Sequence, residues 1–282
     1  MSRIERWSLR LAVVIIALCI HSMHINLSAD ESESDCEARL ASERMDLMRS
    51  QALGFRFTAP EPDFPQSLSP KPLFRYDDHT RGYIDGTVWR LGQEGRPLAI
   101  VTAELHPKYT GVGPRVVYDF LSLTPVPFTA RSSSLVWTPP GSAVEMVAFP
   151  DAPAAAATLP LRMVQMRRLA ERIRATQEVE GQKVQLRLLP KPIDRYCMEA
   201  DAVASDGAIF LLVNGRNPAI MLFLETDGEK WSYGFGRLSL PSVLIAELDG
   251  EPVWQVPAFS SNSLNRPYCA ANVPVTIPGY EP

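Results

Sequence analysis

One sequence pattern occurs twice in this chain, and that repetition limits the available folds more than any other feature. Residues 70–76 read Pro-Lys-Pro-Leu-Phe-Arg-Tyr, and residues 190–196 read Pro-Lys-Pro-Ile-Asp-Arg-Tyr. Further matches follow in the same order: Asp85-Gly86 with Asp206-Gly207, Gly95-Arg96 with Gly215-Arg216, Glu104 with Glu225, Tyr118-x-Phe120 with Tyr233-x-Phe235, and Val136-Trp137 with Val253-Trp254. This period is too long for a solenoid repeat and matches the length of a small domain. The sequence therefore predicts two tandem copies of one folding unit.

Each copy begins with a segment of helical character. Ser34 and Glu37 form a capping-box pattern, and small or apolar residues follow at helical spacing, which predicts a helix from about 35 to 52, before Gly54. In the second copy, Pro160 is suited to the first position of a helix, and the apolar stripe predicts a helix to about 178, before Gly181.

Strand-like segments separated by turn residues follow each helix. They cover residues 87–92, 98–105, 116–124 and 134–137 in the first copy, and 183–189, 208–213, 219–224, 231–235 and 243–248 in the second. Short connections such as Asn214-Gly215 and Asp249-Gly250 favour antiparallel neighbours. The predicted fold class is α+β, in which each copy is one helix followed by a curled antiparallel sheet, a meander of about five strands.

These patterns divide the chain into five parts. We expect a signal peptide at 1–29, a first helix-plus-sheet unit at 30–141, a Pro/Ala-rich linker at 142–159, a second unit at 160–260 and a C-terminal tail at 261–282. Residues 208–213 are apolar on both sides of the predicted strand, whereas 87–92 include Thr87 and Arg90. Because strands that are apolar on both faces are usually covered on both, we expect the second unit to hold the more central core.

The N-terminus is typical of an exported protein. Arg3, Arg6 and Arg10 precede ten apolar residues, and polar residues interrupt the run from His21. A membrane span needs about 20 apolar residues, so an uncleaved anchor is the less favoured alternative, and no stable span is expected after cleavage. The net charge of −4 disfavours a nucleic-acid partner, which needs a basic face. The expected location is the periplasm or the exterior.

Cysteine usage leaves the disulfide question open. Cys36, Cys197 and Cys269 remain after removal of the leader, and exported thiols tend to pair. Cys197 with Cys269 is the first candidate pair, and three free thiols are the alternative. No Cys-x-x-C pattern is present, and the adjacent Asp77-Asp78-His79 is better explained as a polar loop than as a metal site. We predict neither a metal nor a cofactor.

The repeated polar and aromatic residues are the candidate site. They are Arg75, Tyr76, Glu104 and Trp137 in the first copy, and Arg195, Tyr196, Glu225 and Trp254 in the second. These residues could contact a ligand, with tyrosines and tryptophans as platforms and arginines as anchors. The structural interpretation has Glu104 and Glu225 paired with Arg75 and Arg195, and the aromatic rings in the core. The repeated Asp-Gly dipeptides are typical of turns.

Catalytic machinery is sparse. After the leader, the chain has only His79 and His106, and no serine lies in a Gly-x-Ser-x-Gly frame. We therefore predict no catalytic residue and favour a non-catalytic binding or structural protein of the cell envelope or exterior. The alternative is an extracellular glycan or ester hydrolase that uses carboxylates at the interface of the copies.

The second copy also carries a family resemblance. Its motifs are the helical Arg167-Arg-Leu-Ala-Glu-Arg172, the segment Leu-Leu-Pro-Lys-Pro-Ile-Asp-Arg-Tyr at 188–196, Asp206-Gly-Ala-Ile-Phe210, and Trp231-x-Tyr233. Together they resemble uncharacterised exported proteins of planctomycete-type bacteria, over about 160–257 and more weakly over 68–140. The resemblance implies export and a shared fold, and it supplies no activity. A polysaccharide or an envelope protein is the expected partner, and the oligomeric state stays open.

Overall fold

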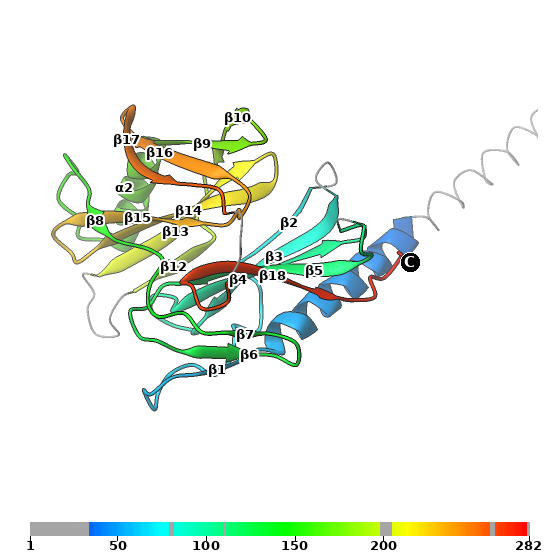
Figure 1. Ribbon diagram of the computed structural model, residues 1–282. Coiled ribbons are helices and arrows are strands. Elements are labelled where there is room, and N and C mark those ends of the chain that lie inside the picture. Colours follow the sequence, from blue (N-terminus) through cyan, green and yellow to red (C-terminus); the bar gives the residue numbers. More distant parts are fainter. Residues whose placement is uncertain (1–33, 79–81, 110, 198–204, 260–262, 281–282) are drawn as a thin grey trace, which may run out of the picture. The chain divides into compact units, whose positions relative to one another are not determined.

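The computed structural model describes residues 34–78, 82–109, 111–197, 205–259 and 263–280 (Figure 1). The expected signal peptide at 1–29 and His79 lie outside these residues. The chain divides into two compact units, residues 1–45 and 46–282. Residues 34–53 are helical, and the boundary between the units falls inside this helix. Among the described residues, no helix has both the length and the apolar character that a bilayer crossing requires.

In the unit 46–282, a five-stranded antiparallel sheet contains most of the strands predicted for the first copy. Its order is β18-β5-β4-β3-β2. The bounds are β2 (Phe74–Asp78), β3 (Tyr83–Leu91), β4 (Ala99–His106), β5 (Arg115–Ser122) and β18 (Tyr268–Pro274). The strand β18 comes from the segment predicted as a tail. It pairs with β5 along its whole length, from Tyr268 opposite Leu121 to Pro274 opposite Arg115.

A six-stranded antiparallel sheet contains most of the strands predicted for the second copy. Its order is β11-β13-β14-β15-β8, and β12 also pairs with β13. The bounds are β8 (Val147–Ala148), β11 (Arg187–Leu188), β12 (Asp194–Tyr196), β13 (Asp206–Asn214), β14 (Asn217–Thr226) and β15 (Trp231–Arg237). The short strand β8 comes from the segment predicted as a linker, and it pairs with β15.

Two smaller antiparallel sheets and the helix α2 (Leu159–Glu171) complete this unit. The first small sheet has the order β1-β6-β7, and the second has the order β10-β9-β16-β17. Their bounds are β1 (Arg56–Thr58), β6 (Thr129–Arg131), β7 (Val136–Trp137), β9 (Ile173–Val179), β10 (Gln182–Gln185), β16 (Val243–Leu248) and β17 (Glu251–Val256). The fold is thus mostly antiparallel sheet with two helices among the described residues, which agrees with an α+β class.

The second helix is shorter than predicted. It ends at Glu171, and the strand β9 begins at Ile173. Residues 173–179 alternate between inward and outward positions, with Ile173, Ala175 and Gln177 buried, which is the period of a strand. Ile173 fits both the helical stripe and this alternation, so the helical prediction ran past the true end.

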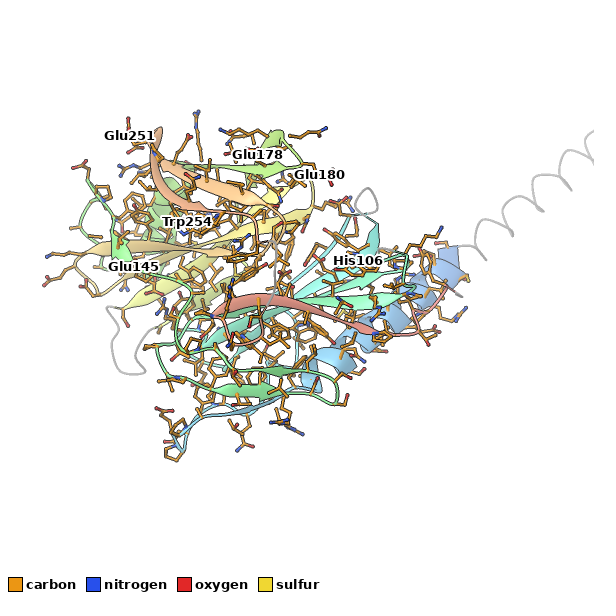
Figure 2. All side chains as sticks on the ribbon, viewed as in Figure 1. His106, Glu145, Glu178, Glu180, Glu251 and Trp254 are labelled. Carbon is orange, nitrogen blue, oxygen red and sulfur yellow. The ribbon has the colours of Figure 1, made fainter. Side chains whose placement is uncertain are left out.

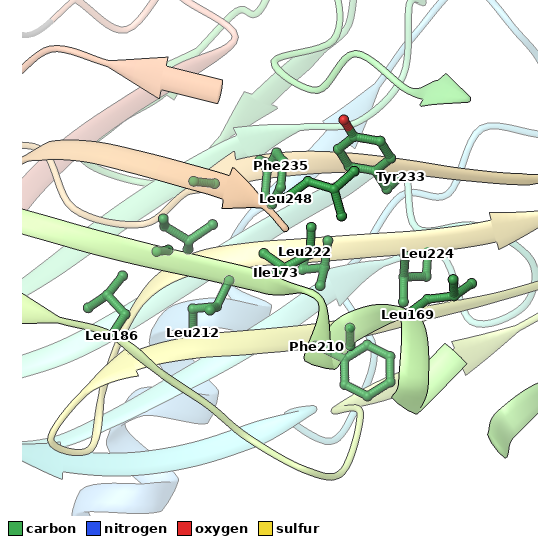
Figure 3. Close-up of a cluster of buried hydrophobic side chains, with 14 of the residues drawn as sticks. Leu169, Ile173, Leu186, Phe210, Leu212, Leu222, Leu224, Tyr233, Phe235 and Leu248 are labelled. Atoms are coloured by element: carbon green, nitrogen blue, oxygen red, sulfur yellow. The ribbon is translucent and has the colours of Figure 1, made fainter. Parts of the chain in front are cut away.

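Buried side chains fill both faces of the six-stranded sheet. On one face, Phe210, Leu212, Leu222 and Leu224 pack with Leu169 and other residues of α2 and with β16 (Figure 3). The alternate residues of these strands, which include Ile209, Leu211 and Phe223, belong to a second buried cluster. That cluster also contains Val88, Ile100 and Leu121 of the five-stranded sheet. The two large sheets therefore pack against each other through this second cluster.

The strand of the first copy that includes Thr87 and Arg90 is buried as well. All nine residues of β3 are buried, as are all of β13 except Asn214. Arg90 is buried in β3 with its charge paired: its guanidinium lies 2.6 Å from Asp194 and donates to the carbonyl of Gly95 at 2.5 Å, while Nε has no hydrogen-bond partner. A charged residue in the sequence therefore did not mark an exposed face.

Candidate functional site

In each large sheet, a tyrosine ring lies across a glycine of the neighbouring strand. Tyr76 is opposite Gly86, and Tyr196 is opposite Gly207. A Cβ atom at Gly86 would lie 2.7 Å from Tyr76 Cε2, and one at Gly207 would lie 2.3 Å from Tyr196 Cε2. The turn prediction for the two Asp-Gly dipeptides is therefore wrong. They lie inside β3 and β13, where glycine leaves room for the ring.

The repeated arginines bind the aspartates of those dipeptides. Arg75 donates to Asp85 with Nε at 2.8 Å and Nη2 at 2.5 Å. Arg195 donates to Asp206 with Nε at 3.0 Å and Nη2 at 2.6 Å. The predicted ion pairs with Glu104 and Glu225 do not form, because the cross-strand aspartates take the bidentate positions.

The repeated glutamates instead accept hydrogen bonds from the tyrosines. The Tyr76 hydroxyl donates to Glu104 Oε1 at 2.9 Å, and the Tyr196 hydroxyl donates to Glu225 Oε1 at 2.7 Å. Burial raises the pKa of both tyrosines well above the ordinary value, and the adjacent carboxylate adds to the rise. Both phenols therefore stay protonated and act as donors.

The two glutamates differ in their second partner. Arg96, from the turn between β3 and β4, places Nε 2.9 Å from Glu225 Oε1, an ion pair without the geometry of a hydrogen bond. Glu104 Oε2 instead lies 3.1 Å from His106 Nε2. Arg216 holds the position in the repeated pattern that matches Arg96. It pairs with Asp77 at 2.9 Å, and its side chain is 73% exposed.

Glu104 lines a cleft of about 770 Å³ that residues of both large sheets and of the β9–β10 hairpin enclose. Its ionisable lining residues are Glu104, His106, Asp119, Glu180, Tyr83 and Tyr109. Amides and hydroxyls of Gln177, Gln182, Asn214, Asn217, Ser239 and Ser242 form much of the remaining wall. Figure 2 labels His106 on the five-stranded sheet and Glu180 at the end of β9. Among the described lining residues there is no arginine or lysine.

Asp119 is the most strongly perturbed carboxyl group in this cleft. It lies in β5, accepts hydrogen bonds from the hydroxyls of Tyr268 and Thr102, and is 7% exposed. Burial raises the pKa of Asp119 to about 7, and the charge of Glu104 acts in the same direction. Near neutral pH the Asp119 carboxyl group is therefore about half protonated.

Aromatic rings surround the histidine. The Tyr83 and His106 ring centroids are 5.2 Å apart, and those of His106 and Tyr109 are 5.4 Å apart. These rings hold His106 beside Glu104 and give this wall flat, partly apolar surfaces with polar edges.

The opposite wall is a fixed polar surface. Gln177 donates to the Ser242 hydroxyl at 2.7 Å, and its carbonyl oxygen accepts from Asn214 at 3.0 Å. Arg237 lies behind the segment 238–242 and donates to the carbonyls of Ser239, Leu240 and Ser242. Because these groups are held in place, the wall presents hydroxyls and amides in fixed positions.

The predicted tryptophans and cysteines do not line the cleft. Trp137 is fully buried and donates to the carbonyl of Arg266 at 2.9 Å, whereas Trp254 is half-buried against Phe235. The predicted disulfide is wrong: Cys197 is an exposed free thiol that follows β12, and Cys269 is a buried one in β18. In the described part of the chain, no group of three or more His, Cys, Asp or Glu residues is placed to hold a metal ion.

Sequence reasoning singled out Glu104 but missed the rest of the cleft. His106, Asp119 and Tyr83 have no counterparts in the second copy, so the repeated pattern did not mark them. One signal was present: Asp119 interrupts the apolar run of residues 116–124. A carboxyl group on the inward face of a buried strand indicates a polar cavity or a pairing charge.

Comparisons with protein-family models, with curated proteins and with solved structures find no match for this chain. The functional argument therefore depends on the cleft itself.

Proposed function

We propose that this chain is an exported, non-catalytic binding protein whose cleft takes a polar ligand. The observation that carries the proposal is the cleft of about 770 Å³, which combines carboxyl groups, aromatic rings and fixed amides. Small-molecule sites in proteins have volumes of roughly 300–1,000 Å³ and a few convergent polar groups. The polar lining suits a small ligand, or the end of a polysaccharide, better than an apolar molecule.

We also infer that the two copies arose by duplication. In each copy, a helix precedes a strand that pairs with the first strand of a later antiparallel pair. β1 pairs with β6, which pairs with β7, and β9 pairs with β16, which pairs with β17. The Tyr-Gly, Arg-Asp and Tyr-Glu contacts also recur in each copy. The cleft draws on both copies, so a doubled gene would have created it.

A second candidate function is hydrolysis of a glycan or an ester. Asp119 and Glu104 both line the cleft, and their environments differ enough to raise the pKa of Asp119 to about 7. Carboxyl groups with separated pKa values are the usual arrangement of acid–base catalysis. Under this alternative, purified protein would hydrolyse a glycan or ester, and either Glu104→Gln or Asp119→Asn would abolish the activity.

The binding proposal can be tested by filling the cleft. Val184 in β10 lines the cleft and is 39% exposed, and Val253 in β17 is equally exposed but does not line it. We expect Val184→Trp to weaken any ligand found by calorimetry or on a glycan array, and Val253→Trp to leave it unchanged. Equal effects of the two substitutions would overturn the proposal. Fractionation of cells that express the tagged chain tests the export proposal.

A further inference from the structure

The two glutamates that accept from tyrosines offer an internal comparison. Tyr196 and Glu225 form one such pair, and Arg96 Nε lies 2.9 Å from Oε1, the same oxygen that accepts the tyrosine hydroxyl. The Glu225 side chain is 7% exposed, and that of Glu104 is 12% exposed. The fold thus contains one example of a cation seated on a Tyr-Glu pair.

At the second pair, Tyr76 and Glu104, the arginine that matches Arg96 in the repeated pattern does not contact the glutamate. Tyr76 donates to Glu104, but Arg216 lies on Asp77, in an exposed ion pair of the kind that contributes little to stability. Glu104 Oε1 accepts the Tyr76 hydroxyl, and Oε2 lies 3.1 Å from His106 Nε2. The Glu104 side chain lines the cleft, in which no described arginine or lysine is a lining residue.

We propose that the cleft binds a ligand through a guanidinium or primary ammonium group that pairs with Glu104, as Arg96 pairs with Glu225. This inference rests on the proposed binding function and names the class of its ligand. A carboxylate that already accepts one hydroxyl retains lone pairs for a second donor. Charge-assisted contacts of this kind are stronger than neutral ones, so the cation would be the anchor of the ligand.

The charges of the wall favour a cation over an anion. Glu104, Asp119 and Glu180 line the cleft, and no described lysine or arginine does. The cation behind the wall, Arg237, is already engaged with the carbonyls of the segment 238–242. An anionic ligand would meet carboxylates at close range, which is unfavourable.

The aromatic residues fit the same ligand class. Tyr83 and Tyr109 line the cleft on either side of His106, and a cation over the face of a tyrosine ring is attracted to it. The amides of Gln182 and Asn214 would face the neutral part of the ligand. A guanidinium group occupies only a small part of the cleft, so a larger body can accompany it.

The test compares Nα-acetyl-L-arginine amide with Nα-acetyl-L-citrulline amide. The acetyl group removes the α-ammonium from both compounds, and citrulline replaces the guanidinium group by a neutral urea of the same shape. Titration calorimetry with the whole chain should give binding of the arginine compound at least about tenfold tighter than the citrulline compound, since charged hydrogen bonds are worth about 1.5–3 kcal/mol. Equal affinities would overturn the inference. A Gly-Arg-Gly peptide in parallel separates a free small molecule from an arginine side chain as the natural source.

The variants locate the contact. Glu104→Gln should weaken the arginine compound by about tenfold or more. Glu178→Gln should have no effect, because Glu178 is exposed on β9 and does not line the cleft (Figure 2). If Glu104→Gln does not fold, the arginine–citrulline comparison on the unaltered chain still decides the matter.

Other outcomes separate this inference from the proposed function. If neutral glycans bind and Val184→Trp weakens them, while the arginine compound does not bind, the cationic ligand is wrong and the binding function stands. If no compound binds, both fail.

Discussion

Asp119 should make the chain less stable as pH rises toward neutrality. Its pKa is about 7 in the folded chain, against an ordinary value of 3.8, because burial and the charge of Glu104 penalise the carboxylate. Between these two values the folded chain holds a proton that the unfolded chain releases. The free energy of unfolding therefore falls as pH rises from about 4 to 7. A shift of about three units at 1.36 kcal/mol each sets a ceiling of roughly 4 kcal/mol.

Replacing Asp119 by asparagine removes the titrating group and keeps its shape. The Tyr268 hydroxyl, which now donates to Oδ1, retains an amide oxygen as acceptor. The amide NH2 takes the place of Oδ2 and faces the Thr102 hydroxyl as a donor, as the protonated carboxyl group can. We expect Asp119→Asn to match the wild type near pH 5, where most of the carboxyl is already protonated. At pH 8 the variant should be more stable, by up to the ceiling of about 4 kcal/mol.

The assay is urea unfolding followed by tryptophan fluorescence at pH 5, 6, 7 and 8. Asp227→Asn is the control. Asp227 is exposed, and the backbone amides of Lys230 and Glu229 lower its pKa. The stabilisation it provides is lost only as pH falls through that lowered pKa, so the control should not alter the slope between pH 5 and 8. Equal slopes for the wild type and Asp119→Asn would refute the reasoning.

Three further substitutions probe the packing, each with thermal and urea unfolding as the measurement. Asp194→Asn should cost about 3 kcal/mol, because it leaves Arg90 buried without its carboxylate; wild-type stability would show that the pair is dispensable. Gly207→Ala should cost about 1–3 kcal/mol, since the new Cβ would lie 2.3 Å from the Tyr196 ring; no loss would mean that the ring moves freely. Met166→Ala should cost about 2–5 kcal/mol, because Met166 is a fully buried residue of α2; a change below about 1 kcal/mol would contradict the packing of that cluster.

Local patterns predicted most of the strands. The segment 243–248 coincides with β16, and the segments 208–213 and 219–224 lie inside β13 and β14. These segments alternate or are apolar throughout, and turn residues bound them, so sequence neighbours alone define them. The end of α2 was misplaced because Ile173 satisfies both helical and strand periodicity.

Pairing between distant segments could not be predicted. Nothing near Tyr268 in the sequence indicates that it faces Asp119, and the run of residues 268–274 has no strong strand signal. The same limit applies to the cleft. Glu104 was singled out because it matches Glu225 in the repeated pattern. His106 and Asp119 have no such match, and only the fold brings them into the cleft. The Arg75–Asp85 pair was missed because it needs the register of β2 on β3.

Two edge strands, β8 and β18, determine what happens when the segments 30–141 and 160–260 are separated. The segment that follows the first copy contributes β8 to the edge of β15, and the segment that follows the second contributes β18 to the edge of β5. Each copy therefore covers a strand edge that the other would leave open. A chain cut between residues 148 and 160 would expose the backbone donors and acceptors of β5, and such open strand edges promote aggregation.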